Sequence, residues 1–197
     1  MIHFKVNNVK HETDKLYTGV IMGKETVLER LLASYRSSFD IERPYAVSGE
    51  TYDAYGAFRV TSSKYVLTKK VELWRAQCYE HVFFKLTEEV TQDLLDRFLK
   101  QIREYIEPQM VRHNEPCPPK DHMYTFITGI YICENGISPE MKKQIRRFRF
   151  SKNYRFTIRG YCDARLVVID VKNQKIYGNP AARDIVNGYR KMKNLFI

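Results

Sequence analysis

Four parts of the chain carry the apolar spacing or the start residues of a helix. In the first of them, Leu28, Leu31 and Leu32 fall on one side of a helix, so that side can be buried. Ser138 followed by Pro139 is typical of the start of another. The predicted helices cover residues 24–39, 87–106, 139–147 and 181–192.

Runs rich in β-branched and aromatic residues predict strands between these helices. The predicted strands are residues 52–60, 65–76, 79–86, 123–134, 153–162, 165–171 and 175–177. The first three are joined by short loops such as 61–64, so we expect an antiparallel meander. The run from 123 to 134 is largely apolar, which is typical of a strand at the centre of a sheet.

The predicted order is a helix, three strands, a helix, a strand, a helix, a strand, a hairpin and a helix. We expect one α/β (α+β) domain over residues 1–197, with a mixed or antiparallel sheet flanked by helices, because this length suits a single core. The first six elements, α-β-β-β-α-β over about residues 24–134, resemble the core of restriction-endonuclease-like folds.

Positive charge is concentrated in the C-terminal part of the chain. Residues 141–197 carry 15 Lys and Arg but only three acids, a net charge of +12, whereas residues 1–140 have a net charge of −2. Such an uneven distribution attracts polyanions. Aromatic residues are interleaved with the cations, which favours nucleic acid as the partner.

The densest basic segment lies in an interval without acids between Glu140 and Asp163. Its candidate phosphate contacts are Lys142, Lys143, Arg146, Arg147, Arg149, Lys152, Arg155 and Arg159. The first four occupy the outer face of the predicted helix 139–147, because Met141, Ile145 and Phe148 form its inward stripe.

Alternation along the predicted strand 153–162 separates cations from rings. One face carries Arg155, Thr157 and Arg159, and the other carries Tyr154, Phe156 and Ile158. We therefore expect helix and strand to share one cationic surface above buried aromatic side chains.

The leading hypothesis is a non-enzymatic nucleic-acid-binding protein whose basic helix and strand contact phosphates. Tyr154 or Tyr161 could also stack on a base. The alternatives are a protein-interaction module whose cationic face meets an acidic partner, and a solvated surface. Membrane contact is not expected, because no helix combines an apolar face with a purely cationic one.

A possible catalytic set is Asp163, Asp170 and Lys172. An apolar strand leading into Asp170-Val171-Lys172 is similar to the second half of the PD-(D/E)XK nuclease motif. The resemblance implies a nuclease in which the two carboxylates hold Mg²⁺ and the lysine positions water. The gap between the aspartates is shorter than in that motif. The other interpretation is a hairpin, with Asp170 and Lys172 solvated near its turn.

No cofactor is expected, apart from Mg²⁺ if the protein is a nuclease, because the chain lacks nucleotide-binding motifs. A metal site is not expected either. His113, Cys117, Asp121 and His122 lie in a proline-rich loop without a standard zinc spacing. His81 is interpreted as a core histidine with a hydrogen-bond partner.

The cysteines and the hydropathy of the chain favour a cytoplasmic protein. Cys78, Cys117, Cys133 and Cys162 have no C-x-x-C spacing, and three of them lie in apolar runs, which predicts reduced thiols. The sequence has neither an apolar run of about 18 residues nor a signal peptide at its start.

Overall fold

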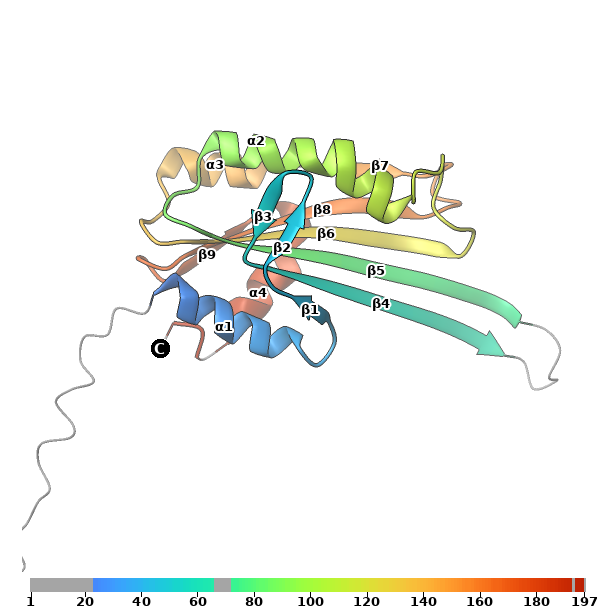
Figure 1. The fold of residues 1–197 in the computed structure, drawn as a ribbon, viewed down its shortest axis with the longest axis horizontal. Coiled ribbons are helices and arrows are strands. Elements are labelled where there is room, and N and C mark those ends of the chain that lie inside the picture. Colours follow the sequence, from blue (N-terminus) through green and yellow to red (C-terminus); the bar gives the residue numbers. More distant parts are fainter. Residues whose placement is uncertain (1–22, 66–71, 193, 197) are drawn as a thin grey trace, which may run out of the picture.

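The computed structural model describes residues 23–65, 72–192 and 194–196. For residues 59–77 it does not describe the side chains. In these parts, a sheet lies between two layers of helices, with α2 and α3 on one face and α1 and α4 on the other (Figure 1). The helical elements are α1 (Lys24–Tyr35), α2 (Gln92–Gln101), the π-helical segment η1 (Ile102–Val111), α3 (Pro139–Arg147), the 3-10 turn η2 (Pro180–Ala182) and α4 (Arg183–Lys191).

The main sheet has the strand order β1-β4-β5-β6-β8-β7, and β9 also pairs with β8. Its strands are β1 (Asp40–Glu42), β4 (Ala54–Tyr65), β5 (Glu72–Thr87), β6 (His122–Cys133), β7 (Ser151–Asn153), β8 (Tyr161–Asp170) and β9 (Lys175–Gly178). β5, β6 and β8 are parallel to one another, and the other pairs are antiparallel. A separate hairpin is formed by β2 (Tyr45–Val47) and β3 (Glu50–Tyr52). The predicted α/β fold with a mixed sheet flanked by helices is confirmed.

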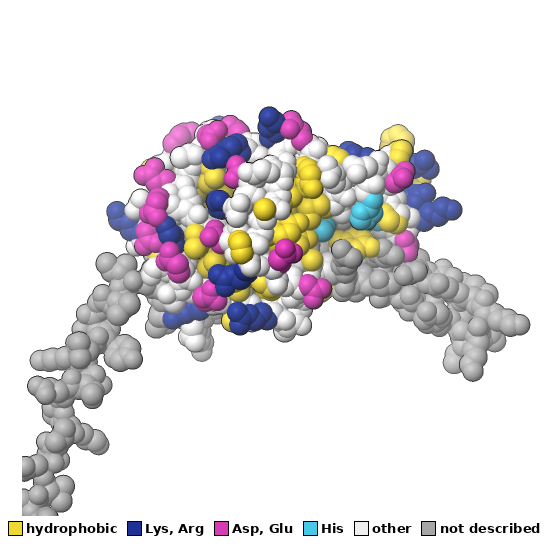
Figure 2. Space-filling model, in the orientation of Figure 1, with side chains coloured by type: hydrophobic (Ala, Val, Ile, Leu, Met, Phe, Trp, Pro, Cys, Tyr) yellow, Lys and Arg dark blue, Asp and Glu magenta, His cyan; other side chains and the backbone are white. Residues whose placement is uncertain are grey.

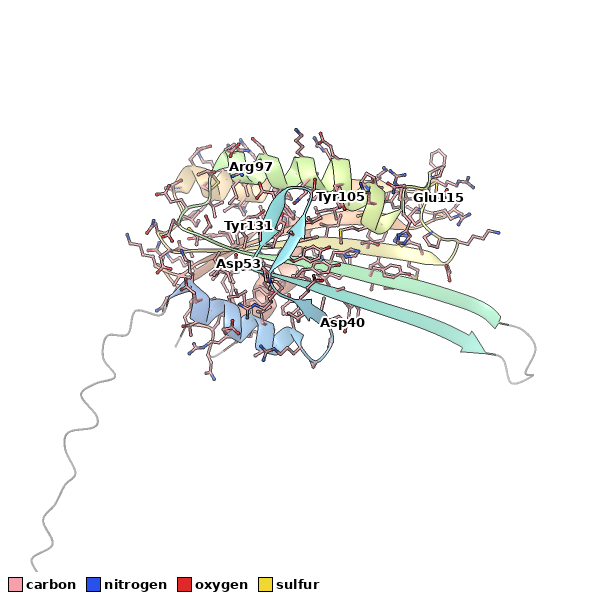
Figure 3. All side chains as sticks on the ribbon, viewed as in Figure 1. Asp40, Asp53, Arg97, Tyr105, Glu115 and Tyr131 are labelled. Atoms are coloured by element: carbon pink, nitrogen blue, oxygen red, sulfur yellow. The ribbon has the colours of Figure 1, made fainter. Side chains whose placement is uncertain are left out.

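The sheet divides the apolar residues into two cores. Leu166 and Val168 of β8 point into the core under α2 and α3, whereas Val167 and Ile169 point into the core under α1 and α4. Tyr131 of β6 lies between the sheet and α2 (Figure 3), where its ring centroid is 5.8 Å from that of Phe98. Both faces are covered here, which explains why the central strands are almost continuously apolar.

The predicted three-strand meander is wrong, because the structure has two long strands in its place. Residues 61–64, predicted as a loop, belong to β4 and pair with residues 74–77 of β5. Polar residues can occupy a strand whose stability comes from backbone hydrogen bonds to its neighbour. β4 ends at Tyr65 and β5 begins at Glu72.

The second predicted helix begins and ends later than its sequence indicated. Thr87 ends β5, and the side chain of Thr91 is the N-cap, accepting a hydrogen bond from the backbone N–H of Leu94 at 3.2 Å. Pro108, predicted to end the helix, lies inside η1. Proline lacks the N–H that an α-helical ladder needs, and the chain passes it with π-helical pairing.

Candidate functional site

A groove of about 430 Å³ between α3, β9 and α4 is rich in positive charge. Four cations line it, Lys142 and Arg146 from α3 and Arg183 and Arg190 from α4, and no acid does. A hollow that presents several fixed positive charges can surround an anionic group from more than one side.

Helix α3 positions its two cations through its buried side. The Ser138 hydroxyl caps the helix by accepting from the backbone N–H of Met141 at 3.1 Å, and Pro139 follows at the first helical position, as predicted. Ile145 is fully buried. Lys142 and Arg146 are four residues apart, so they lie on one side of the helix.

Helix α4 supplies the opposite wall. Its buried residues are Val186 and Tyr189, and Arg183 and Arg190 lie seven residues apart, about two turns. The sequence prediction missed both arginines. Their spacing on the predicted helix 181–192 was the signal that could have found them.

Gly178 allows α4 to approach the sheet closely. A Cβ at this position would lie 2.7 Å from the Val186 Cγ2 atom and 2.9 Å from the Leu166 carbonyl oxygen. Either distance is too short, so any larger residue would push α4 outward.

Asn179 fixes the base of the groove. It is buried, and its Nδ2 donates to the carbonyl oxygens of Phe148 and Ala164 at 3.1 and 3.0 Å. Its Oδ1 accepts from the backbone N–H of Leu166 at 3.0 Å. One side chain thereby connects the end of α3, the strand β8 and the start of the last helical segment.

The positive charge of the groove is not neutralised within the described parts of the chain. None of its four cations forms an ion pair with a described carboxylate. The Lys142 Nζ atom lies 5.1 Å from the centroid of the Tyr177 ring, and the Arg190 Nη2 donates to the Ile176 carbonyl oxygen at 2.9 Å. These contacts orient the side chains without removing their charge.

The other predicted phosphate contacts are in different environments. Arg147 and Arg149 are exposed, Lys143 pairs with Glu140 at 3.5 Å, and Lys152 pairs with the buried Glu107 at 3.0 Å. Lys143 and Lys152 are therefore partly neutralised. The structure places Lys142 and Arg146 in the groove, whereas Arg147 and Arg149 are exposed and do not line it.

The predicted strand 153–162 is wrong, and with it the single surface shared by helix and strand. β7 ends at Asn153 and β8 begins at Tyr161. The chain between them makes a tight turn, in which Gly160 and three residues in a row have positive φ angles. The three are Arg155 (47°), Phe156 (53°) and Thr157 (70°).

The side chains of this turn do not alternate as predicted. Tyr154 is buried, in agreement with the prediction, but Phe156 is 97% exposed and Ile158 is 78% exposed. Arg155 is exposed, while Arg159 is half-buried, with its Nη1 donating to the Pro118 carbonyl oxygen at 3.5 Å. Left-handed backbone breaks the twofold alternation of a strand, so the period-two pattern has no structural basis here.

Tyr154 anchors the turn to a buried carboxylate. Its hydroxyl donates to the Glu107 Oε1 at 2.7 Å, and Arg112 and Lys152 bind the same carboxylate at 2.7 and 3.0 Å. Burial alone would raise the pKa of Glu107, but the hydrogen bonds from these three partners outweigh it and lower that pKa.

The three candidate nuclease residues are not brought together. Asp163 and Asp170 lie seven residues apart on β8, roughly 23 Å along the strand, and their side chains point to opposite faces of the sheet. Two such carboxylates cannot hold one metal ion. Lys172 is exposed in the turn that follows.

The predicted hairpin is formed by β8 and β9, and Lys172 is exposed near its turn as predicted, but Asp170 is buried rather than solvated. Its Oδ2 accepts from the backbone N–H of Ile137 at 3.1 Å, and its Oδ1 accepts from that of Asn173 at 2.9 Å. The carboxylate therefore joins the β8–β9 turn to the segment that leads into α3.

Asp163 lies instead in a polar cluster with Arg165 on the α1 and α4 side of the sheet. The Arg165 Nη1 is 3.4 Å from the Glu80 Oε1, and its guanidinium carbon is 3.2 Å from the centroid of the Phe126 ring. The Asp163 Oδ1 and the Arg165 Nε are buried without a hydrogen-bond partner among the described residues.

The histidines have structural contacts. His81 is buried, as predicted, with its Nδ1 2.6 Å from the Tyr55 hydroxyl. The His122 Nδ1 donates to the Arg159 carbonyl oxygen at 2.9 Å, and its Nε2 lies 2.9 Å from the Thr125 hydroxyl. Within the described ranges, no three His, Cys, Asp or Glu side chains form a group that could hold a metal ion.

Comparison with protein families identifies the chain. Residues 23–191 match the family described as Domain of unknown function (DUF8052), and because the match covers most of the chain, the chain belongs to this family. Neither the curated proteins nor the solved structures gave a match. The resemblance to restriction-endonuclease-like folds therefore stays a prediction. In the described part of the chain, each helix is too short or too polar to cross a bilayer.

Proposed function

We propose that this DUF8052 domain binds nucleic acid without catalysis, and that the groove between α3, β9 and α4 holds phosphates of the bound strand. The observation that carries the proposal is the set of four cations around one hollow, with no lining acid and no ion pair to a described carboxylate. Arg147 at the end of α3 and Arg149 just after it are exposed and add to the positive charge of the surface.

The chemistry of the groove suits phosphate. Three of its four cations are arginines, whose planar guanidinium groups donate two parallel hydrogen bonds to one phosphate. Each phosphate that the protein neutralises releases condensed counterions, so binding weakens steeply with salt. Because such contacts carry no base information, we expect weak sequence preference.

An acidic protein partner is the alternative that the same charges allow, and the binding experiment below separates nucleic acid from such a partner.

A cytoplasmic location is also proposed. The four cysteines are free thiols, which supports a compartment that keeps thiols reduced.

The test is a titration of the protein against a generic duplex and a generic single strand at two ionic strengths. The groove variant is Arg146→Glu with Arg183→Glu. The matched control is Lys100→Glu with Arg103→Glu, which changes the net charge equally on exposed residues of α2 and η1.

We expect wild type to bind with a strong salt dependence and the control to retain most of the affinity. The groove variant should lose binding, and the slope of log affinity against log salt should fall by about 0.9 for each duplex phosphate contact removed. An equal loss of affinity in both double variants would show that binding depends on the net charge of the protein and not on the groove. Binding to a protein partner with none to nucleic acid would favour the alternative.

A further inference from the structure

The turn between β7 and β8 presents an aromatic ring that the fold does not use. Phe156 is 97% exposed, and the other exposed large apolar side chains of the described residues, Ile158 and Met123, lie at the same end of the sheet. Figure 2 shows apolar side chains projecting beside Lys and Arg at one end of the molecule. A ring with almost no protein contacts contributes little to folding.

The backbone of the turn is strained as well as exposed. Arg155, Phe156 and Thr157 all have left-handed φ angles, which L-residues with a Cβ adopt at a cost. Strained backbone that persists in a folded protein is often found at functional sites.

The turn is nevertheless held by hydrogen bonds, both within itself and to the body of the protein. Within the turn, the backbone N–H of Ile158 donates to the Arg155 carbonyl oxygen at 3.1 Å, and that of Gly160 donates to the Thr157 carbonyl oxygen at 2.8 Å. At its two ends, the Tyr154 hydroxyl binds Glu107 and the Arg159 carbonyl accepts from His122. A rigid support reduces the entropy lost when a ligand contacts the ring.

From this geometry we propose that Phe156 stacks on an unpaired base of the bound nucleic acid, with Arg155 next to an adjacent phosphate. This inference rests on the proposed function. Exposed aromatic rings between cations are the means by which proteins bind single strands, because every base offers a face for stacking. In a regular duplex, the bases are already stacked on one another and their faces are covered.

The position of the turn relative to the groove supports contacts to one extended strand. Gly178 of the groove pairs with Val167 on β8, and the turn ends where β8 begins at Tyr161. Six residues of strand separate these points, roughly 20 Å. Groove and ring can therefore contact different nucleotides of the same strand.

The experiment measures Phe156→Ala on two probes, a single-stranded oligonucleotide carrying 2-aminopurine and a fully paired duplex. Loss of one stacked base is expected to weaken single-strand binding between about fivefold and 150-fold and to leave duplex binding unchanged. Phe156→Tyr should restore both the affinity and the quenching of 2-aminopurine fluorescence. Ile158→Ala, which removes an exposed side chain without a ring, should have little effect.

Two results would overturn stacking while the proposed function stands. One is equal single-strand affinity for wild type and Phe156→Ala, with the groove variant still impaired. The other is Phe156-dependent retention on anionic lipid vesicles with no dependence of single-strand binding on the ring, which would assign the turn to a membrane surface. If wild type binds neither nucleic-acid probe, the proposed function fails and stacking fails with it.

Discussion

The Nδ2 of Asn179 donates a hydrogen bond of 3.1 Å to the carbonyl oxygen of Phe148, and so ties the start of the last helical segment to the end of α3. Phe148 is the C-cap residue of α3 and is itself buried against the α2 side of the sheet. The relative position of the two groove walls therefore depends on one buried amide, whose polar groups all need partners.

Replacing Asn179 with Ala should destabilise the protein by about 1–3 kcal/mol, because a backbone N–H and two carbonyl oxygens would lose a buried partner. The free energy of unfolding from urea titration measures this effect. Asn187→Ala is the matched control, since Asn187 lines the same groove but is exposed. A change within about 0.5 kcal/mol is expected there. Equal effects of the two substitutions would contradict the structural role of Asn179.

Gly160→Ala should be strongly destabilising. Its φ is +74°, which costs an L-residue about 1–2 kcal/mol, and an added Cβ would lie 2.1 Å from the Met123 carbonyl oxygen. Gly188 in α4 provides the opposite case, because a Cβ there meets nothing within 4 Å. Gly188→Ala should stabilise by about 0.5–1 kcal/mol. Thermal unfolding of both variants tests the pair, and a stable Gly160→Ala protein would show that the turn differs from the one described.

The stability contributed by Glu107 should depend on pH. Its pKa is lowered in the folded protein, so its contribution is complete above the unfolded pKa of about 4.3 and is lost as the pH falls through the folded pKa. Glu107→Gln should cost ~3 kcal/mol near neutral pH, and the difference in unfolding free energy from wild type should narrow as the pH falls below the unfolded pKa and through the lowered folded one. The exposed Glu104→Gln is the control. A gap that does not vary with pH would argue against an ionised Glu107.

Asp170→Asn should act on stability and not through a metal. Asn has one acceptor oxygen where Asp has two, so the backbone N–H of either Ile137 or Asn173 loses its acceptor, at a cost of about 1–3 kcal/mol. We expect the thermal midpoint of wild type to be the same with and without Mg²⁺. Stabilisation by Mg²⁺ that is lost in Asp170→Asn, or metal-dependent cleavage of plasmid or RNA that is lost in Asp170→Ala, would support the nuclease alternative instead.

The elements that the sequence predicted best are those with strong apolar burial. α1, with Leu28 and Leu31 fully buried, begins where predicted but ends four residues earlier, at Tyr35. The central strand β6, which is apolar on both faces, lies one residue earlier than predicted. Around α3, Ser138 and Pro139 mark the start of the helix directly. Here local chemistry and burial point to the same structure.

The elements that the sequence predicted poorly depend on contacts between distant residues. Tyr154, Phe156 and Ile158 alternate as in a strand, but the turn is held by Glu107 and His122 from elsewhere in the chain. Positive φ angles at residues with a Cβ leave no sequence signal, and Gly160, the one residue here that is typical of a turn, was included in the predicted strand. The burial of Asp170 likewise follows from Ile137, which lies 33 positions away.

The groove also has a consequence for folding during translation. Its walls combine α3 with residues 177–190, so the hollow cannot form on the ribosome until residue 190 has left the exit tunnel. Before that point, a nascent chain carries Lys142 and Arg146 of α3 without the arginines of the facing wall. The four cations surround one hollow only after both helices have folded.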